Sequence, residues 1–244
     1  MQDCWPPTKV SRKPFHPAVL QACVGAVICA CLLFPYVLAD AAESRCPGQN
    51  VVVHWDDSGD MDVVCDAASD AIGFLAGNGF DTSKTIDVHL VDKLPREASA
   101  SSYGCYDHPH LRVYMLNYSD CLKRGPWADM PMDRELYKSL LAHEVAHAVA
   151  ATNFSTPKPG VLAHEYVAYV TMFAIMAPDQ RQRLLKQFPG RGFDSVNQMS
   201  TTYYLMNPLR FGVESYRHFL KQDDGKALFE GILTGQVRIG NGGR

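Results

Sequence analysis

The chain has 244 residues, of which 47% are hydrophobic and 20% are charged, a composition typical of globular proteins. Its formal net charge is −3, which argues against a nucleic-acid-binding role because such proteins present a basic face. No internal repeat or low-complexity segment is visible, so the sequence indicates an ordinary folded protein.

The amino-terminal segment, residues 1–41, has the organisation of a secretory signal peptide. Residues 18–38 are mostly apolar and uncharged, and Ala39-Asp40-Ala41 offers a cleavage site. Positive charges precede the apolar stretch at Lys9, Arg12 and Lys13. The alternative is an uncleaved membrane anchor, because the apolar stretch is nearly long enough to span a bilayer. We therefore expect a secreted or periplasmic protein, or a membrane-anchored one if the segment is retained.

The cysteines also indicate export. Four of the eight lie in the predicted leader, and Cys46, Cys65, Cys105 and Cys121 remain in the mature part. An even number in an exported chain predicts two disulfides. We expect the pairs Cys46–Cys65 and Cys105–Cys121, because each pair brackets one predicted strand and its turn. None of these cysteines has the C-x-x-C spacing of a zinc ribbon, so structural zinc held by cysteine is not expected.

The mature part, residues 42–244, is predicted to be one α+β domain with a zincin-like fold. Its first lobe, residues 42–153, alternates runs of strand and helix periodicity. The expected strand, helix, strand, strand and helix lie at Val51–Trp55, Met61–Ala76, Thr85–Val91, Leu111–Leu116 and Met132–Ala151. This order gives a small mixed sheet with helices packed on it.

The second lobe, residues 154–244, is predicted to be mainly helical. Helices are expected at Gly160–Ala177 and Asp179–Phe188, because each is followed by a proline, and at Val213–Gly235 with a break near Asp223-Asp224-Gly225. Two segments are expected to lack regular structure, namely Gly104–Pro109 in the first lobe and 191–212 in the second.

The most informative motif is His143-Glu144-Val145-Ala146-His147, inside the predicted helix Met132–Ala151. Residues four apart share a helix face, so the two imidazoles project side by side with a spacing that suits two ligands of one zinc ion. Glu144 is turned by about 100° from His143 around the helix. This places Glu144 beside the ion, where a general base for a zinc-bound water belongs.

A catalytic zinc site usually takes three protein ligands and leaves one position for water. Glu165 is the favoured third ligand, because it lies near the start of the next predicted helix and the chain can turn back between 152 and 160. Ala168, one turn further along, is small enough to allow a close approach of the two helices. His164 is the alternative ligand, although it points about 100° away from Glu165 on a helix.

The motif His143-Glu144-x-x-His147, followed by a glutamate on a second helix, resembles the gluzincin group of zinc metallopeptidases, the thermolysin-like arrangement. The resemblance covers Met132 to about Tyr169. It implies zinc as cofactor, His143, His147 and Glu165 as ligands, Glu144 as base, and a peptide or protein as substrate. One position departs from thermolysin, which has an aspartate four residues after the ligand glutamate where this chain has Tyr169. A phenol could accept the same hydrogen bond from a histidine ligand, but without the charge.

We therefore expect an exported zinc-dependent peptidase in which Glu144 activates the attacking water. The oxyanion needs a second electrophile besides zinc, and four side chains of the second lobe are candidates: Tyr203, Tyr204, Tyr216 and His218. The substrate is expected to add as a strand to a sheet edge, at Leu111–Leu116. An alternative interpretation is a zincin-like domain that binds zinc or a partner without turnover, and a third is a structural protein without metal.

Overall fold

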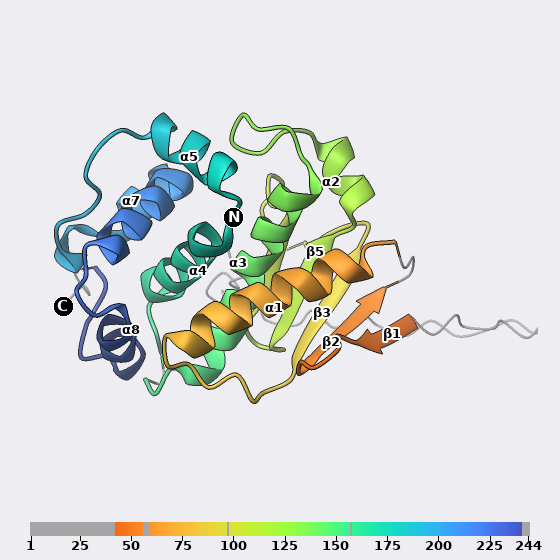
Figure 1. Cartoon of the computed structure of the whole chain (residues 1–244), viewed down its shortest axis with the longest axis horizontal. Coiled ribbons are helices and arrows are strands. Elements are labelled where there is room, and N and C mark those ends of the chain that lie inside the picture. Colours follow the sequence, from red (N-terminus) through yellow and green to blue (C-terminus); the bar gives the residue numbers. More distant parts are fainter. Residues whose placement is uncertain (1–41, 56–58, 97, 157, 241–244) are drawn as a thin grey trace, which may run out of the picture.

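The computed structural model describes residues 42–55, 59–96, 98–156 and 158–240, so the predicted leader lies outside the described residues (Figure 1). A small mixed sheet and several helices make up this part of the chain, which confirms the α+β class. Across these ranges, no helix has both the length and the apolar character needed to cross a membrane.

The sheet has five strands in the order β1-β2-β3-β5-β4. The three inner strands are parallel, and the two edge strands run antiparallel to their neighbours. In chain order the strands are β1 (Ala42–Arg45), β2 (Val51–Trp55), β3 (Ile86–Val91), β4 (Gly104–Asp107) and β5 (Arg112–Leu116). Along β3, residues Ile86, Val88 and Leu90 are buried and alternate with half-buried residues, as expected for a sheet with one face on the core.

Two expectations for the sheet were wrong. The segment Gly104–Pro109, expected as a loop, contains the edge strand β4, and Leu111–Leu116, expected to offer an edge, forms the inner strand β5 between β3 and β4. Strand β4 is too short to show an alternating pattern, and the turn after it reaches a positive φ of 55° at Leu111. The turn residues in this segment predicted a loop, whereas the segment forms a strand because it pairs with β5. Strand β1 was also not expected.

The helices of the first lobe are α1 (Met61–Gly77), α2 (Tyr118–Arg124) and α3 (Arg134–Asn153). Figure 1 shows α1 and α3 lying over one face of the sheet. Helix α1 turns Val64, Ala68, Ala71 and Leu75 into the core, which confirms the helical spacing read from the sequence. The short helix α2 was not expected.

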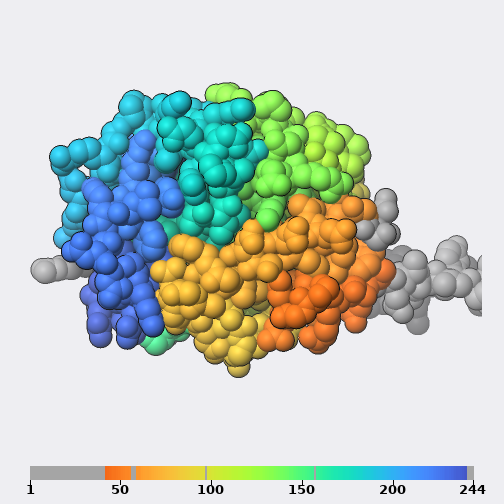
Figure 2. Space-filling model, in the orientation of Figure 1, coloured from red at the N-terminus to blue at the C-terminus, as the bar shows by residue number. Residues whose placement is uncertain are grey.

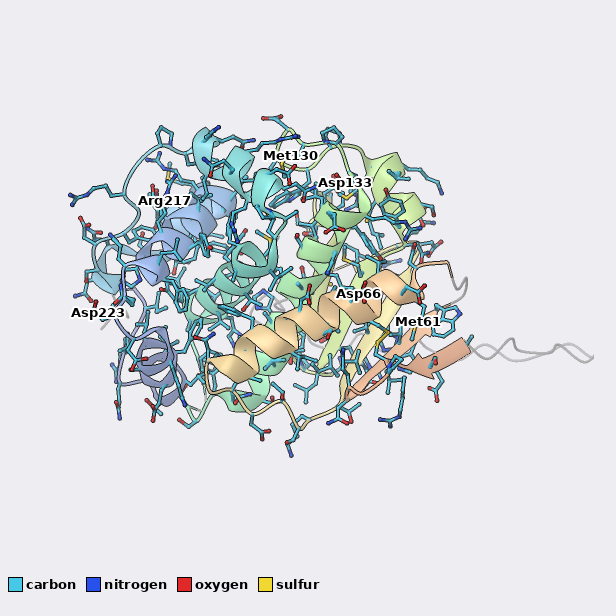
Figure 3. The ribbon with its side chains drawn as sticks, in the orientation of Figure 1. Met61, Asp66, Met130, Asp133, Arg217 and Asp223 are labelled. Atoms are coloured by element: carbon cyan, nitrogen blue, oxygen red, sulfur yellow. A yellow bond between two sulfur atoms is a disulfide. The ribbon has the colours of Figure 1, made fainter. Side chains whose placement is uncertain are left out.

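Helix α3 is the central element of the fold. Apart from Lys138, every residue from Leu136 to Ala150 is buried, because the sheet, α1 and α4 surround the helix. A helix that is apolar on all sides is one that the core encloses. Asp133 lies at the amino end of the helix (Figure 3). Its carboxylate accepts a hydrogen bond of 2.8 Å from the backbone N–H of Leu136 and two from the side chain of Gln180 on α5. The helix start is thereby fixed to the second lobe.

The second lobe is helical, with α4 packed on α3 and α7 packed on α4. Figure 2 shows these carboxy-terminal helices, in teal and blue, joining the first lobe without a break in the visible surface. The helices are α4 (Val161–Ile175), α5 (Pro178–Gln187), α6 (Thr201–Met206), α7 (Pro208–Leu220) and α8 (Gly225–Thr234). The break expected near Asp223-Asp224-Gly225 is confirmed, since it separates α7 from α8.

The expectation that residues 191–212 are irregular was wrong. They contain a 3-10 turn at Val196–Gln198, helix α6 and the first residues of α7. These short helices begin with side-chain caps, because Ser200 accepts from the N–H of Tyr203 and Asn207 accepts from the N–H of Arg210. The polar residues that cap these helices are also common in loops, and for this reason the composition of the segment predicted a loop.

One of the two expected disulfides is confirmed. Cys46 and Cys65 are bonded, which links the β1–β2 turn to α1 across a Cα–Cα distance of 5.2 Å. The expected Cys105–Cys121 bond is wrong, because Cys121 is a free buried thiol that lies near the carbonyl oxygen of Leu116. The α2 helix carries Cys121 into the core, and proximity in the sequence therefore did not predict the partner.

Candidate metal centre

Two histidines of α3 face each other one helical turn apart. The Nε2 atoms of His143 and His147 are 3.1 Å apart, and their rings meet edge to face with centroids separated by 4.7 Å. Both side chains are buried. The expectation that these imidazoles share one face of a helix is confirmed, since α3 is regular through both positions.

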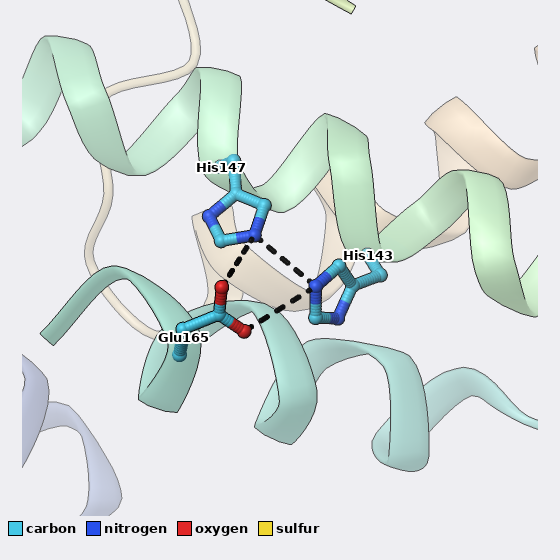
Figure 4. A group of neighbouring side chains, drawn as sticks. All are labelled: His143, His147 and Glu165. Atoms are coloured by element: carbon cyan, nitrogen blue, oxygen red, sulfur yellow. Dashed lines mark hydrogen bonds and ion pairs between the residues drawn. The ribbon is translucent and has the colours of Figure 1, made fainter. Parts of the chain in front are cut away.

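Glu165 reaches the same point from α4 (Figure 4). Its Oε2 lies 3.7 Å from Nε2 of His143, and its Oε1 lies 3.8 Å from Nε2 of His147. Within the described residues, these three are the one group of histidine, cysteine or acidic side chains whose ligand atoms all lie within 4.8 Å of one another. The packing of α4 on α3 therefore brings Glu165 next to the two histidines of the His143–His147 motif.

The geometry of the cluster suits a metal ion. Ligands at the corners of a tetrahedron with bonds of 2.0–2.1 Å lie about 3.4 Å apart, close to the separations of these donor atoms. Burial holds the pKa of His143 well below its usual range, with a contribution from His147, and lowers the pKa of His147 to about 3. Both imidazoles are therefore neutral at neutral pH, the form in which a ring nitrogen binds a metal. With the carboxylate of Glu165, they make a set that could hold a divalent ion.

His164, the alternative third ligand, lies beside the cluster rather than in it. Its ring packs against Phe154 at 4.6 Å and stands 6.0 Å from the ring of His147, between centroids. The turn of about 100° between neighbouring helical residues directs His164 away when Glu165 faces the histidines.

Glu144 is buried on the side of α3 that faces strand β4. Its Cγ lies so close to Gly104 that a Cβ atom added to Gly104 would stand 2.9 Å from it. The same added atom would stand 3.0 Å from the backbone oxygen of Tyr114. Glycine is therefore required at this position of the strand if the carboxylate is to keep its place. Nothing in the sequence indicated this role of Gly104.

Three tyrosines surround the ligand cluster. The hydroxyl of Tyr204 donates a hydrogen bond of 2.8 Å to Oε1 of Glu165, in the protein interior. The ring of Tyr169 packs edge-on against the ring of His143 at 4.6 Å, and the ring of Tyr106 lies parallel to that of His147 at 6.2 Å. Nδ1 of His143 has no hydrogen-bond partner among the described residues, so Tyr169 does not accept a hydrogen bond from it. The two side chains contact each other through their rings.

The sequence offered four candidates for the second electrophile of the site, and the structure brings only one of them, Tyr204, into contact with a residue of the cluster. Tyr204 contacts Glu165, whereas Tyr203 donates to Glu214 at 2.7 Å. Tyr216 stacks on Phe173, and His218 bonds the hydroxyl of Tyr166 at 2.8 Å. The fold places Tyr204 at the cluster because α6 packs against α4. That packing depends on α6, a helix that the sequence did not reveal.

The fold and the cluster define an α+β protein with a buried two-histidine, one-glutamate group that could hold a metal ion. The chain belongs to a family of unknown function (DUF6639), and the match covers residues 51–241, which include every residue of the cluster. Comparison with the curated proteins and with the solved structures found no significant match.

Proposed function

We propose that this protein is a zinc-dependent peptidase of the gluzincin type, with a zincin-like fold, that hydrolyses peptide bonds. One observation carries the proposal: His143, His147 and Glu165 converge from two helices at separations of 3.1 to 3.8 Å, with Glu144 next to them in the chain. Two neutral imidazoles and one carboxylate are the ligand set of several catalytic zinc sites.

Each residue of the group has a role in this proposal. A bound zinc ion would supply Lewis-acid chemistry and lower the pKa of a bound water. His143, His147 and Glu165 would hold the ion. Glu144 accepts the proton of the attacking water and passes it to the leaving amine. Tyr204 keeps the carboxylate of Glu165 in one orientation, because its hydroxyl donates to one of the two oxygens.

The location of β4 supports a peptide as substrate. Strand β4 is an edge of the sheet, and its Gly104 lies against Glu144. Extended peptides commonly bind as a further strand at the edge of a sheet. A peptide bound along β4 would pass beside the carboxylate that moves the proton. This role replaces the one that the sequence assigned to Leu111–Leu116, which is an inner strand.

Export is part of the proposal. The disulfide between Cys46 and Cys65 fits an oxidising compartment, as expected of a protein that a signal peptide directs out of the cytoplasm. Secretion of the intact chain and determination of the mature amino terminus by mass spectrometry would test this part. Recovery of the protein with residues 1–41 still attached in a membrane fraction would favour the anchor instead.

The central experiment compares the purified protein with its Glu144→Gln variant. Zinc content, measured by inductively coupled plasma mass spectrometry, is expected to be equal in both. Hydrolysis of an unfolded protein substrate is expected to fall by roughly a hundredfold or more in the variant, because proton transfer is lost. Glu135→Gln is the matched control, since Glu135 is an exposed residue at the start of the same helix. Equal hydrolysis by the protein and the Glu144→Gln variant would contradict the proposal.

A second candidate function is zinc binding without turnover. The observation in its favour is that Nδ1 of His143 has no hydrogen-bond partner among the described residues, whereas catalytic histidine ligands usually donate to a carboxylate or carbonyl. Stoichiometric zinc together with no hydrolysis of peptide libraries, at any pH at which the protein is folded, would favour this function over the peptidase.

A further inference from the structure

A cavity of about 590 Å³ lies beside the metal centre, between the end of α3, the start of α4 and the segment that follows α8. Its wall is mainly apolar and includes Phe154, Ala163, Ile232, Val237 and Ile239. This volume falls within the range of pockets that bind small organic ligands. Burying an apolar group in such a cavity is favourable because apolar surface is removed from water.

Positive charge is concentrated at the cavity. Lys158 and Arg238 are among its lining residues, and both are exposed. In the part of the chain that the structure describes, neither of them is among the lysine and arginine residues that form salt bridges. Gly160, the N-cap residue of α4, also lies in the cavity wall, and no described side chain caps this helix end. The amino end of a helix carries partial positive charge, so it adds to the two cations.

The cavity and the metal centre share a wall. Phe154 lines the cavity and packs against the ring of His164 at 4.6 Å, and the ring of His164 stands 6.0 Å from that of His147. Ala163 lines the cavity from α4, two residues before Glu165. The Phe154 and His164 rings therefore stand between the cavity and the ligand cluster, and an occupant would lie beside the cluster without touching the metal position.

We propose that this cavity binds an apolar group that carries a carboxylate, with the apolar part inside and the carboxylate at Lys158 and Arg238. Two kinds of molecule have this chemistry, a peptide with an apolar carboxy-terminal residue and a fatty acid. Both present one negative charge next to an apolar body, which matches the apolar wall and the two cations at its rim. The binding site goes beyond the proposed peptidase function, because it requires neither the metal ion nor hydrolysis.

The test is isothermal titration of the Glu144→Gln protein, in which no peptide is consumed. The probes are an acetylated tripeptide ending in phenylalanine with a free carboxylate, the same peptide as its amide, and dodecanoate. At least one of the two carboxylates is expected to bind. If the peptide binds, its amide is expected to bind roughly threefold to thirtyfold more weakly, which is the effect of losing contacts with two exposed cations. Binding by one carboxylate alone identifies the source of the ligand.

Matched variants assign the binding to the cavity. The double variant Lys158→Gln, Arg238→Gln is expected to weaken the carboxylate by the same factor as amidation and to leave the amide unchanged. Ala163→Leu, which fills the cavity, is expected to abolish binding while the zinc content stays the same. Lys186→Gln removes an exposed cation elsewhere and is expected to change nothing. Equal affinity of acid and amide, an unchanged double variant, or no binding by either carboxylate would overturn the proposal whether or not the protein proves to be a peptidase.

Discussion

The hydroxyl of Tyr204 donates a hydrogen bond of 2.8 Å to Oε1 of Glu165, and both side chains are buried. The bond connects α6 to α4 and fixes one oxygen of the carboxylate that faces His143 and His147. A carboxylate held by a tyrosine loses rotational freedom before an ion binds. The proposed metal site is therefore ordered in part by a residue that contacts a ligand rather than the ion.

Replacing Tyr204 by phenylalanine is expected to lower zinc affinity by roughly tenfold to a hundredfold, because the ligand carboxylate loses its hydrogen-bond donor. Competition with a chromogenic chelator measures the change. The matched control is Tyr203→Phe, which removes a neighbouring hydroxyl that bonds Glu214 at 2.7 Å. The same zinc affinity in both variants would show that the Tyr204 hydroxyl does not act on the site.

The contact between Gly104 and Glu144 leads to a second prediction. Gly104→Ala would place a Cβ atom 2.9 Å from Cγ of Glu144 and 3.0 Å from the backbone oxygen of Tyr114, so the side chain and the strand must both shift. We expect peptide hydrolysis to fall by roughly a hundredfold while zinc is retained, since small displacements of a catalytic group have effects of this size. Gly73→Ala is the control, because nothing lies within 4 Å of a Cβ added at Gly73. Loss of zinc from Gly104→Ala would instead indicate that the ligand helix itself is displaced.

The amino end of α3 provides a test of stability. Asp133 accepts hydrogen bonds from the N–H of Leu136 and from the side chain of Gln180, so Asp133→Ala removes a helix cap and leaves the buried amide of Gln180 with fewer partners. We expect the free energy of unfolding to fall by about 1–3 kcal/mol, measured by urea denaturation. Asp179→Ala is the control, because Asp179 is exposed in the first turn of α5 and its ion pair with Arg183 spans 3.8 Å. A loss as large in the control would remove the argument from capping.

The state of Cys121 can be checked by alkylation. Burial raises the pKa of its thiol to about 12, so the reactive thiolate is scarce at pH 8. Iodoacetamide is expected to label the peptide that contains Cys121 after unfolding in guanidinium chloride and not in the native protein. Cys46 and Cys65 are expected to stay unlabelled in both states unless a reductant is added, because they are bonded to each other. Rapid labelling of Cys121 in the native protein would place its thiol at the surface.

The sequence by itself determined the elements with strong local signals. The alternation of Ile86, Val88 and Leu90 specified β3, and the spacing of His143 and His147 on a helix fixed their common direction. These properties depend on the geometry of one strand or one helix, which is set by neighbouring residues. The convergence of Glu165 with the two histidines was also predictable, because a short connection between two apolar helices leaves them few ways to pack.

Tertiary structure alone decided the rest. Strand β4 exists because β5 pairs with it, and its edge position follows from the order of the sheet rather than from its own residues. Tyr204 meets Glu165, and Cys121 stays unbonded, because of where α6 and α2 pack. Gly104 has its role because a strand and a helix approach too closely for a Cβ atom. Such contacts join residues distant along the chain, and local propensity carries no information about which distant surfaces will meet.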